Sequence, residues 1–334
     1  MIRQIKLRDF RNYNELQLEI NSGLNLFIGN NGQGKSNLLE AIFFAAMLRS
    51  FRTSRINDIK NIGAKSFYIG IEAFTGGRWP KMFEVEYSNV RKLRIDGNPI
   101  AKASEFIRDI RTVAFLPDDI DIITGNSGLR RRFCDMFLAI TCPHYMLSLH
   151  HYVTALKTRN AVLKSNRHDI GMIEAYEPVM AAAAAMIIKG RQDYAIRLTS
   201  EVKTMLHQFH DPECRFDIRY RTDTDGTEEG FMKKLENDRR RDQQRGFTGS
   251  GIQLDDFDIF YNDKLLRNFG STGQCRLISL CLKMANVNIL ASNRSVRQEN
   301  IIVLVDDVTG ELDENTRNSF FQVINRAGQS FFTF

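Results

Sequence analysis

Eight residues near the N-terminus constrain the fold of this 334-residue chain more than any other part of the sequence. They read Gly29-Asn30-Asn31-Gly32-Gln33-Gly34-Lys35-Ser36 and fit the pattern G-x-x-x-x-G-K-[ST] at every fixed position. Glycines let such a loop wrap so that successive backbone N–H groups point at phosphate oxygens. An apolar run over 24–28 precedes the loop, and apolar residues at helical spacing follow it over 35–48. The pattern therefore predicts a phosphate-binding loop between a buried strand and a helix.

The residue types in this loop predict how a nucleotide would bind. Lys35 would contact the β and γ phosphates as a catalytic residue, and the Ser36 hydroxyl would be a ligand of Mg²⁺. The helix that begins near Lys35 adds the positive end of its dipole. A chance match in a glycine turn arises on the order of once per hundred chains of this length, and it would lack the flanking strand and helix. ATP and Mg²⁺ are the predicted cofactors, and Asn37 is included in the predicted site.

A second signal lies near the C-terminus, where two acidic residues follow an apolar run. Residues 301–305 read Ile-Ile-Val-Leu-Val, which is typical of a buried strand, and Asp306 and Asp307 come next. Sheets of α/β proteins bind ligands at the carboxyl ends of their strands. Asp306 would hold Mg²⁺ through water, and Asp307 would orient the attacking water as a catalytic residue. Alone, the pattern is also that of a strand entering a loop. Combined with the phosphate loop, it indicates an NTPase.

A run of small residues, Phe269-Gly270-Ser271-Thr272-Gly273-Gln274, precedes another helical segment. Backbone donors at a helix N-terminus bind anions, and a Ser or Thr N-cap beside a glycine is the alternative. The order of motifs favours anion binding. A phosphate loop, a long insert, this run, the apolar strand with two aspartates, and then Glu311-Leu312-Asp313 is the layout of ABC-type ATPases. In that layout Ser271, Gly273 and Gln274 would bind the γ-phosphate held by a partner subunit.

The remaining sequence divides into segments with mixed strand and helix patterns and a helical insert. Strands are predicted within 2–7, 16–20, 24–28, 67–74, 83–87, 93–95, 216–220, 257–261, 301–305 and 330–333. Residues 127–210 carry a helical pattern, with Pro143 and Pro178 as expected helix boundaries. We therefore predict an α/β protein whose head (1–120 plus 246–334) has the ABC-type layout of a P-loop ATPase. Residues 121–245 would form a mainly helical inserted lobe.

Composition excludes several other classes of protein. The start of the chain alternates apolar and charged residues and lacks the apolar core of a secretory signal. The longest apolar run, Val179–Ile188, has ten residues, whereas a membrane span needs roughly 20. Five scattered cysteines without a CxxC pair argue against a disulfide scaffold or a zinc ribbon. We expect a cytoplasmic protein without a membrane segment.

Basic residues are unevenly distributed along the chain. The net charge is +6, and residues 126–168 carry seven basic residues against one acidic residue, so this segment holds the whole surplus. A basic insert beside a neutral head suits a polyanionic partner such as DNA. Arg130, Arg131 and Arg132 would fan around a helix, so some of them are expected in ion pairs or lobe packing. Arg239–Arg241 with Arg245 are expected in a charged flexible loop, with phosphate contact as the alternative.

The sequence resembles the RecF family of bacterial recombination-repair ATPases, which are related to SMC proteins, over nearly its whole length. The N-terminal block and the Gly-Ser-x-Gly-Gln-x-Arg block are the most specific parts of the resemblance. The matching text comprises Phe10-Arg11-Asn12-Tyr13, residues 29–42, Arg49-Ser50-Phe51-Arg52, Arg131-Arg132-Phe133 with Asp135, Arg159-Asn160, residues 269–276, and Asp306-Asp307 followed by Glu311-Leu312-Asp313.

The resemblance implies an ABC-type, SMC-like P-loop ATPase head, lobe I, with an inserted helical lobe II. ATP would join two heads into a homodimer, with each phosphate loop facing residues 270–274 of the other head. The dimer would clamp duplex or gapped DNA near single-strand/double-strand junctions without reading bases, and would help load RecA with RecO and RecR. The resemblance also places an arginine near the nucleotide. Arg49 and Arg52 follow the phosphate-loop helix, and Arg52 is the candidate. An arginine that complements a helix dipole is the alternative.

The sequence departs from the family pattern at three places. Gly251-Ile252-Gln253-Leu254-Asp255-Asp256 stands where family members usually carry Gly-Pro-His-Arg-Asp-Asp. Asp307 stands where many ABC enzymes use Glu, and its shorter side chain predicts slow hydrolysis. The sequence reaches Phe334 near the expected switch residue, for which Thr333 is the candidate, and before the family's last helix and strand. Two alternatives stay open: another soluble ABC-type ATPase, or an ATP-gated DNA-binding module without effective hydrolysis.

Overall fold

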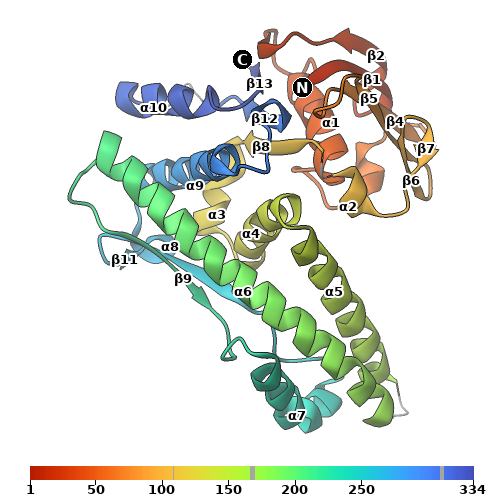
Figure 1. Cartoon of the computed structure of the whole chain (residues 1–334), viewed down its shortest axis with the longest axis vertical. Coiled ribbons are helices and arrows are strands. Elements are labelled where there is room, and N and C mark those ends of the chain that lie inside the picture. Colours follow the sequence, from red (N-terminus) through yellow and green to blue (C-terminus); the bar gives the residue numbers. More distant parts are fainter. Residues whose placement is uncertain (108, 166–169, 309–311) are drawn as a thin grey trace. The chain divides into compact units, whose positions relative to one another are not determined.

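The computed structural model describes residues 1–107, 109–165, 170–308 and 312–334, and it divides into two compact units (Figure 1). Unit 1 comprises Met1–Asp119, Met205–Pro212 and Ser279–Phe334. Unit 2 comprises Ile120–Thr204 and Glu213–Ile278. The sequence predicts that the head resumes at residue 246. In the structure, residues 213–278 belong to unit 2, because strands within 216–265 pair with each other. The assignment of functional lobes stays a prediction.

An antiparallel sheet of six strands forms one part of unit 1, in the order β2-β1-β4-β5-β6-β7. Its strands are β1 (Ile2–Phe10), β2 (Tyr13–Glu19), β4 (Phe67–Ala73), β5 (Lys81–Tyr87), β6 (Arg91–Ile95) and β7 (Asn98–Pro99). Ile5 lies opposite Leu18 of β2 and Ile71 of β4, and it is fully buried. The period-two apolar pattern of the sequence therefore marks the buried face of this sheet, as predicted.

A parallel sheet of four strands carries the chemistry-bearing segments of unit 1, in the order β3-β13-β12-β8. The strands are β3 (Gly23–Phe27), β8 (Arg111–Phe115), β12 (Ile301–Asp306) and β13 (Gln329–Thr333). Every residue of β12 is buried, which explains why residues 301–305 are all apolar. Because the strands are parallel, their carboxyl ends meet at one edge of the sheet. The phosphate loop follows β3 at that edge, and Asp306 and Thr333 end β12 and β13 there.

Helix α1 (Lys35–Met47) begins directly after the phosphate loop and is buried from Leu38 to Met47. Unit 1 also contains α2 (Ala103–Phe106) and α10 (Glu314–Ile324), with short 3₁₀ turns η1 (Ile56–Ile59) and η3 (Gln298–Asn300). The turn η2 (Pro117–Ile120) and the helices α6 (Ile170–Phe209) and α9 (Thr272–Ser292) extend across the division between the units. The helix predicted over 35–48 and the helical segment predicted to follow the run 269–274 are thus present.

Unit 2 is mainly helical and has a small sheet in the order β11-β10-β9. Its elements are α3 (Asp121–Thr124), α4 (Ser127–Thr141), α5 (Pro143–Lys164), most of α6, β9 (Phe216–Arg221), α7 (Glu228–Arg245), β10 (Asp256–Tyr261), β11 (Lys264–Leu265) and α8 (Leu266–Phe269). One hydrophobic cluster joins α5, α6 and α7, and it includes Tyr152, Ala181, Ala184 and Phe231. Five alanines, Ala181 to Ala185, interrupt the larger apolar residues of the run Val179–Ile188, and small side chains of this alanine run in the cluster allow helices to approach closely.

Two expectations for this region are wrong. Pro143 is the first residue of α5, as expected, but Pro178 lies inside α6 and does not begin a helix. Proline removes one backbone hydrogen bond, and α6 tolerates this loss because Met180, Ala181 and Ala184 next to it are fully buried in the core. Arg239–Arg241 belong to helix α7, not to a flexible loop. Thr227 caps that helix by accepting from the Gly230 N–H, at 2.9 Å.

Two helices are long and apolar enough to cross a membrane by length and composition alone, namely α6 over Ile170–Gln208 and α9. Buried helices of globular proteins pass the same test. In α9, 67% of the apolar window is buried inside the protein, and in α6 Ala184 and Ile187 are fully buried. Neither helix is a convincing membrane span.

Asp313 caps helix α10, and its removal is expected to destabilise unit 1 in a pH-dependent way. Its carboxylate accepts from the Thr316 hydroxyl at 2.6 Å and from the Thr316 N–H at 3.0 Å, and these bonds lower the pKa of Asp313 below its ordinary 3.8. A lowered pKa stabilises the fold above the ordinary value, and the stabilisation is lost as pH falls through the folded-state value. Asp313→Ala should cost about 1 kcal/mol at neutral pH. Urea unfolding should show a smaller difference from wild type at acidic pH.

Candidate nucleotide-binding site

The phosphate loop has the backbone conformation that its glycines predict. Gly34 is the N-cap of α1 and has a φ of 103°, in the left-handed region that favours glycine. A Cβ at Gly34 would lie 2.5 Å from Nδ2 of Asn12, so a larger residue would also collide there. The side chain of Tyr13 donates to the Gly34 carbonyl at 3.1 Å, and burial raises the pKa of Tyr13. The N-terminal segment 10–13 therefore packs directly against the loop.

The side chains of the loop close it on itself. The Lys35 ammonium donates to the carbonyls of Gly29 at 2.5 Å and Asn30 at 2.9 Å. The Gln33 side-chain oxygen accepts from the Asn30 N–H at 3.1 Å. A cation surrounded by a tight loop at the N-terminus of α1 is a suitable arrangement for a polyphosphate. The predicted residues Gly29–Ser36 thus form one local structure.

Asp306 is the point where three predicted segments meet. The Ser36 hydroxyl and the Thr333 hydroxyl each donate to Oδ1 of Asp306, both at 2.7 Å. The Arg52 guanidinium lies 3.8 Å from Oδ2 of the same carboxylate. Mg²⁺ is usually bound by one or two protein oxygen ligands together with substrate phosphates. Ser36 and Asp306 provide that donor set next to the phosphate loop, so these residues fit the ion.

Asp307 follows Asp306 but differs from it in exposure and in backbone conformation. Its side chain is exposed, and its backbone has a φ of 51°, a left-handed conformation that Asp adopts more readily than most residues. It lies just beyond the end of β12, at the edge of the sheet that carries the phosphate loop. An exposed carboxylate at this place can contact water, as the predicted role requires.

Arg52 and Asn37 belong to one chain of hydrogen bonds beside the loop. Arg52 donates to Oδ1 of Asn37 at 2.7 Å, and Nδ2 of Asn37 donates to Oδ1 of Asn12 at 2.8 Å. Asn12 in turn donates to the Gln33 carbonyl at 3.1 Å. The structure therefore brings Arg52 to the candidate site, as the family resemblance implies. It does not show the alternative, in which this arginine only complements a helix dipole.

Sequence reasoning gave no role to Arg11, Glu40 and Ser50, although all three lie behind the site. Glu40 is fully buried in α1, accepts two bonds from Arg11 and accepts another from the Ser50 hydroxyl. One signal could have found it. Glu40 is an acidic residue between Leu39 and Ala41 in an apolar helix, and such residues are almost never fully buried unless they are paired.

The run 269–274 lies in unit 2 and begins helix α9. The Ser271 N–H donates to the Gln274 side chain at 3.0 Å, and the Ser271 hydroxyl accepts from the Gln274 N–H at 3.2 Å. This reciprocal pair is a capping box, so the N-cap alternative describes what these residues do in the isolated chain. A Cβ at Gly270 would lie 2.8 Å from the Leu266 carbonyl, which accounts for the glycine. Binding of a partner's nucleotide by Ser271, Gly273 and Gln274 stays a prediction.

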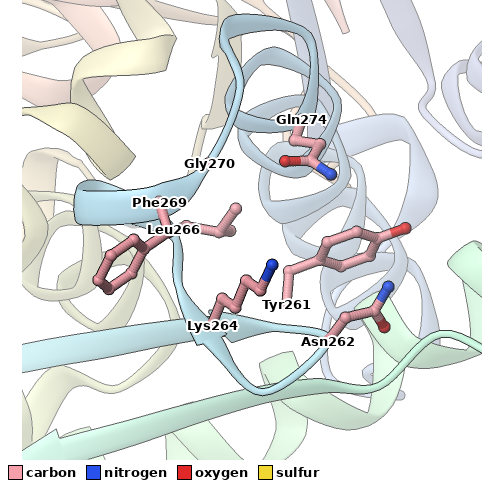
Figure 2. Close-up of a pocket in the computed structure, with 7 residues that line it drawn as sticks. All are labelled: Tyr261, Asn262, Lys264, Leu266, Phe269, Gly270 and Gln274. Carbon is pink, nitrogen blue, oxygen red and sulfur yellow. The ribbon is translucent and has the colours of Figure 1, made fainter.

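A small open pocket of about 150 Å³ adjoins this run (Figure 2). Lys264 after the β10–β11 turn and Gln274 of α9 lie on different sides of it, and Phe269 beside it is 70% exposed. The full lining is Tyr261, Asn262, Lys264, Leu266, Phe269, Gly270 and Gln274. Pockets that enclose a drug-sized ligand have about 300–1,000 Å³, so this one does not enclose a nucleotide.

Several basic residues of the insert are not available to DNA. Arg130 forks onto Asp256 with bonds of 2.7 and 3.1 Å, and Arg159 is fully buried against Asp242 and Glu177. The ion pair of Arg130 confirms the expectation that some of the arginines at 130–132 serve ion pairs, and the burial of Arg159 removes another charge from the surplus that could face DNA. Exposed cations do remain at Lys157 and Lys164 of α5. Arg167 and Glu311, both named from the sequence, lie outside the described residues.

The altered stretch 251–256 supplies acceptors for buried arginines. Arg191 donates to the Ile252 carbonyl at 2.9 Å and to Oδ2 of Asp255 at 3.2 Å, and Asp256 binds Arg130. Burial raises the pKa of Asp255, and its contacts with Tyr220 and Arg191 oppose that rise. The two aspartates shared with the family pattern thus hold unit 2 together. The residues that replace His and Arg, Gln253 and Leu254, do not take part in these ion pairs.

Comparison with known proteins places the whole chain in one family. A family model described as an AAA domain matches residues 4–123. The DNA replication and repair protein RecF of Ruminiclostridium cellulolyticum is 32% identical, with 100% of this chain and 92% of the relative covered. The RecF of Leptospira interrogans is 31% identical, with 99% and 91% covered.

Solved structures agree with these sequence relatives. The recombination mediator protein RecF-ATP of the RecFOR pathway superposes with a TM-score of 0.91 at 28% identity, over 100% of this chain and 91% of that one. The Smc head domain of Pyrococcus furiosus, at 15% identity and a TM-score of 0.54, covers 99% of this chain and shows the fold alone. With the ABC-type, SMC-like head fold and 32% identity over its whole length, this chain belongs to the RecF family of DNA replication and repair proteins.

Proposed function

We propose that this chain is an ATP-dependent DNA-binding repair protein that dimerises on ATP. The observation that carries the proposal is the meeting of Ser36 with Asp306 next to a complete phosphate loop, in a chain of the RecF family. ATP would bind along residues 29–37, with the Lys35 ammonium at the β and γ phosphates. Mg²⁺ would bind Ser36 directly and Asp306 through water, and would neutralise phosphate charge.

The second half of the site would come from another copy of the chain. In ABC-type ATPases, the small-residue run of one subunit covers the γ-phosphate on the other, and here that run comprises Ser271, Gly273 and Gln274. Phe269 beside this run is 70% exposed, as expected for a surface that a partner covers. ATP would thus hold the homodimer together, and hydrolysis would release it.

The dimer would act in the cytoplasm on duplex or gapped DNA near single-strand/double-strand junctions, and would assist RecA loading with RecO and RecR. Contacts would go to phosphates from exposed cations such as Lys157 and Lys164, and not to base edges. Binding of this type weakens steeply as salt rises. DNA affinity measured between low and moderate salt should therefore fall steeply, and affinity that does not change with salt would argue against the proposal.

Hydrolysis is proposed to be slow and to depend on Asp307. Its carboxylate is one methylene shorter than the Glu of many ABC enzymes, and it is exposed. Replacing Asp307 with Asn should reduce phosphate release by about 10²-fold, the lower range for loss of a general base. ATP binding should persist in this variant, because Asp307 lies outside the phosphate loop.

Single-turnover phosphate release, measured with and without duplex DNA, tests this proposal and its main alternative. Release by the wild type that DNA accelerates, and that Asp307→Asn removes, supports an ATPase. Equal and negligible release by both proteins, with ATP still bound, supports an ATP-gated DNA-binding module without effective hydrolysis. The exposed, short carboxylate of Asp307 is the observation that keeps this alternative open.

A further inference from the structure

We infer that Glu40 is a positioning residue that holds both the phosphate loop and Arg52 in the geometry that binds ATP. The inference rests on the proposed nucleotide site. Glu40 lies in the second turn of α1 and is 0% exposed, so its carboxylate depends entirely on protein partners. Those partners come from two segments far from each other in sequence, 10–13 and 50–53, and both segments continue into the site.

The first partner is Arg11, which binds Glu40 through a two-pronged ion pair. Nε of Arg11 donates to Oε2 at 2.9 Å and Nη2 donates to Oε1 at 2.6 Å. Such paired bonds orient the guanidinium as well as attract it. Arg11 also has a left-handed φ of 52°, so the ion pair stabilises an uncommon backbone conformation. The next residue, Asn12, donates to the Gln33 carbonyl of the phosphate loop at 3.1 Å.

The second partner is Ser50, which links Glu40 to the turn that carries Arg52. The Ser50 hydroxyl donates to Oε1 of Glu40 at 2.5 Å and accepts the N–H groups of Arg52 at 2.9 Å and Thr53 at 3.0 Å. Ser50 itself is only 3% exposed. The backbone of Arg52 is thus fixed through one hydroxyl, and the Arg52 guanidinium lies 4.0 Å from Glu40.

Both segments meet again at the nucleotide side of α1. Arg52 donates to Asn37 and lies beside Asp306, and Asn37 donates to Asn12. Glu40 therefore closes a ring of contacts around the first turns of α1. Replacing a buried ion pair by apolar residues is often neutral or stabilising, so stability alone does not require a carboxylate here. Its geometry serves instead to place Asn12 and Arg52.

The test compares Ser50→Ala and Glu40→Gln with a matched control, Glu177→Gln. Glu177 is also fully buried and also binds two arginines, Arg159 at 3.1 Å and Arg239 at 2.6 Å, but it lies in unit 2. ATP affinity is measured by equilibrium titration of the full chain with Mg²⁺, and unfolding is measured in parallel. At metal sites, loss of a residue that orients a ligand commonly lowers affinity by about 10–100-fold. We expect Ser50→Ala and Glu40→Gln to lower ATP affinity by about the same factor.

Glu177→Gln should lose stability and keep wild-type ATP affinity, which separates positioning from general destabilisation. Ser50→Thr, which retains the hydroxyl, should recover most of the affinity that Ser50→Ala loses. Wild-type affinity in a folded Ser50→Ala protein would overturn the inference, and this variant decides the matter if Glu40→Gln does not fold. Failure of the wild type itself to bind ATP would instead contradict the proposed function.

Discussion

Replacing Lys35 with arginine is expected to abolish ATP-dependent dimerisation and the DNA retention that depends on it, while the chain still folds. The Lys35 ammonium is a compact charge held by two loop carbonyls at 2.5 and 2.9 Å. A planar guanidinium cannot occupy the same small volume, so the contact with the β and γ phosphates is lost. The fold should survive, because Lys35 is only partly buried and its ammonium donates to carbonyls of the loop itself.

Sedimentation velocity with and without ATP measures this effect directly. The wild type should sediment faster when ATP is added, and Lys35→Arg should sediment as a monomer in both conditions. Its ATP affinity should fall by at least about tenfold, which corresponds to about 1.4 kcal/mol. An unchanged ATP-dependent shift in sedimentation would refute the assigned role of Lys35, and far-UV circular dichroism would confirm that the variant is folded.

Replacing Arg159 with methionine is expected to destabilise unit 2 by about 3–5 kcal/mol, because it leaves buried carboxylates without a cation. Arg159 donates to Asp242 at 2.8 Å, to the Thr248 hydroxyl at 2.7 Å and to Glu177 at 3.1 Å. Asp242 and Glu177 are fully buried. Arg239 also binds Glu177, so the loss should be greatest at Asp242, which has no other ion pair among the described residues.

Lys157→Met is the matched control for this prediction, because Lys157 lies on the same helix but is exposed. Surface substitutions usually change stability by about 0.5 kcal/mol or less. Urea unfolding followed by far-UV circular dichroism suits both variants, since unit 2 is mainly helical. DNA affinity, in contrast, should fall in Lys157→Met. Equal stability of the two variants would show that the buried network contributes little to unit 2.

Local chemistry made much of the fold predictable. Period-two alternation over 2–7 and 16–20 identified β1 and β2, and the continuous apolar run over 301–305 identified β12. The phosphate loop was predictable because its function needs consecutive residues with special backbone angles, such as Gly34. These signals are short in range, so they can be read from neighbouring residues without knowledge of the chain's path.

Contacts between residues far apart in sequence were less predictable, and they changed the structural roles of several residues. Pro178 reads as a helix boundary, but packing of the alanine run keeps α6 continuous. Arg130 and Arg159 belong to the basic segment that favours a polyanionic partner, but their partners Asp256 and Asp242 lie 126 and 83 residues away in sequence. The residues next to an arginine in the sequence do not show which distant carboxylate will pair with it.

The sequence by itself determined the candidate nucleotide-binding residues of this protein, which are Gly29–Ser36, the acidic end of β12, and the small-residue run 269–274. Only the tertiary structure decided how the phosphate loop and the acidic end of β12 meet. Ser36 bonds to Asp306 across 270 residues, and Thr333 reaches the same oxygen. The physical reason is that parallel strands bring their carboxyl ends to one edge of a sheet whatever their separation in sequence. The same packing buried Glu40 behind that edge, where its partners could not be read from the chain alone.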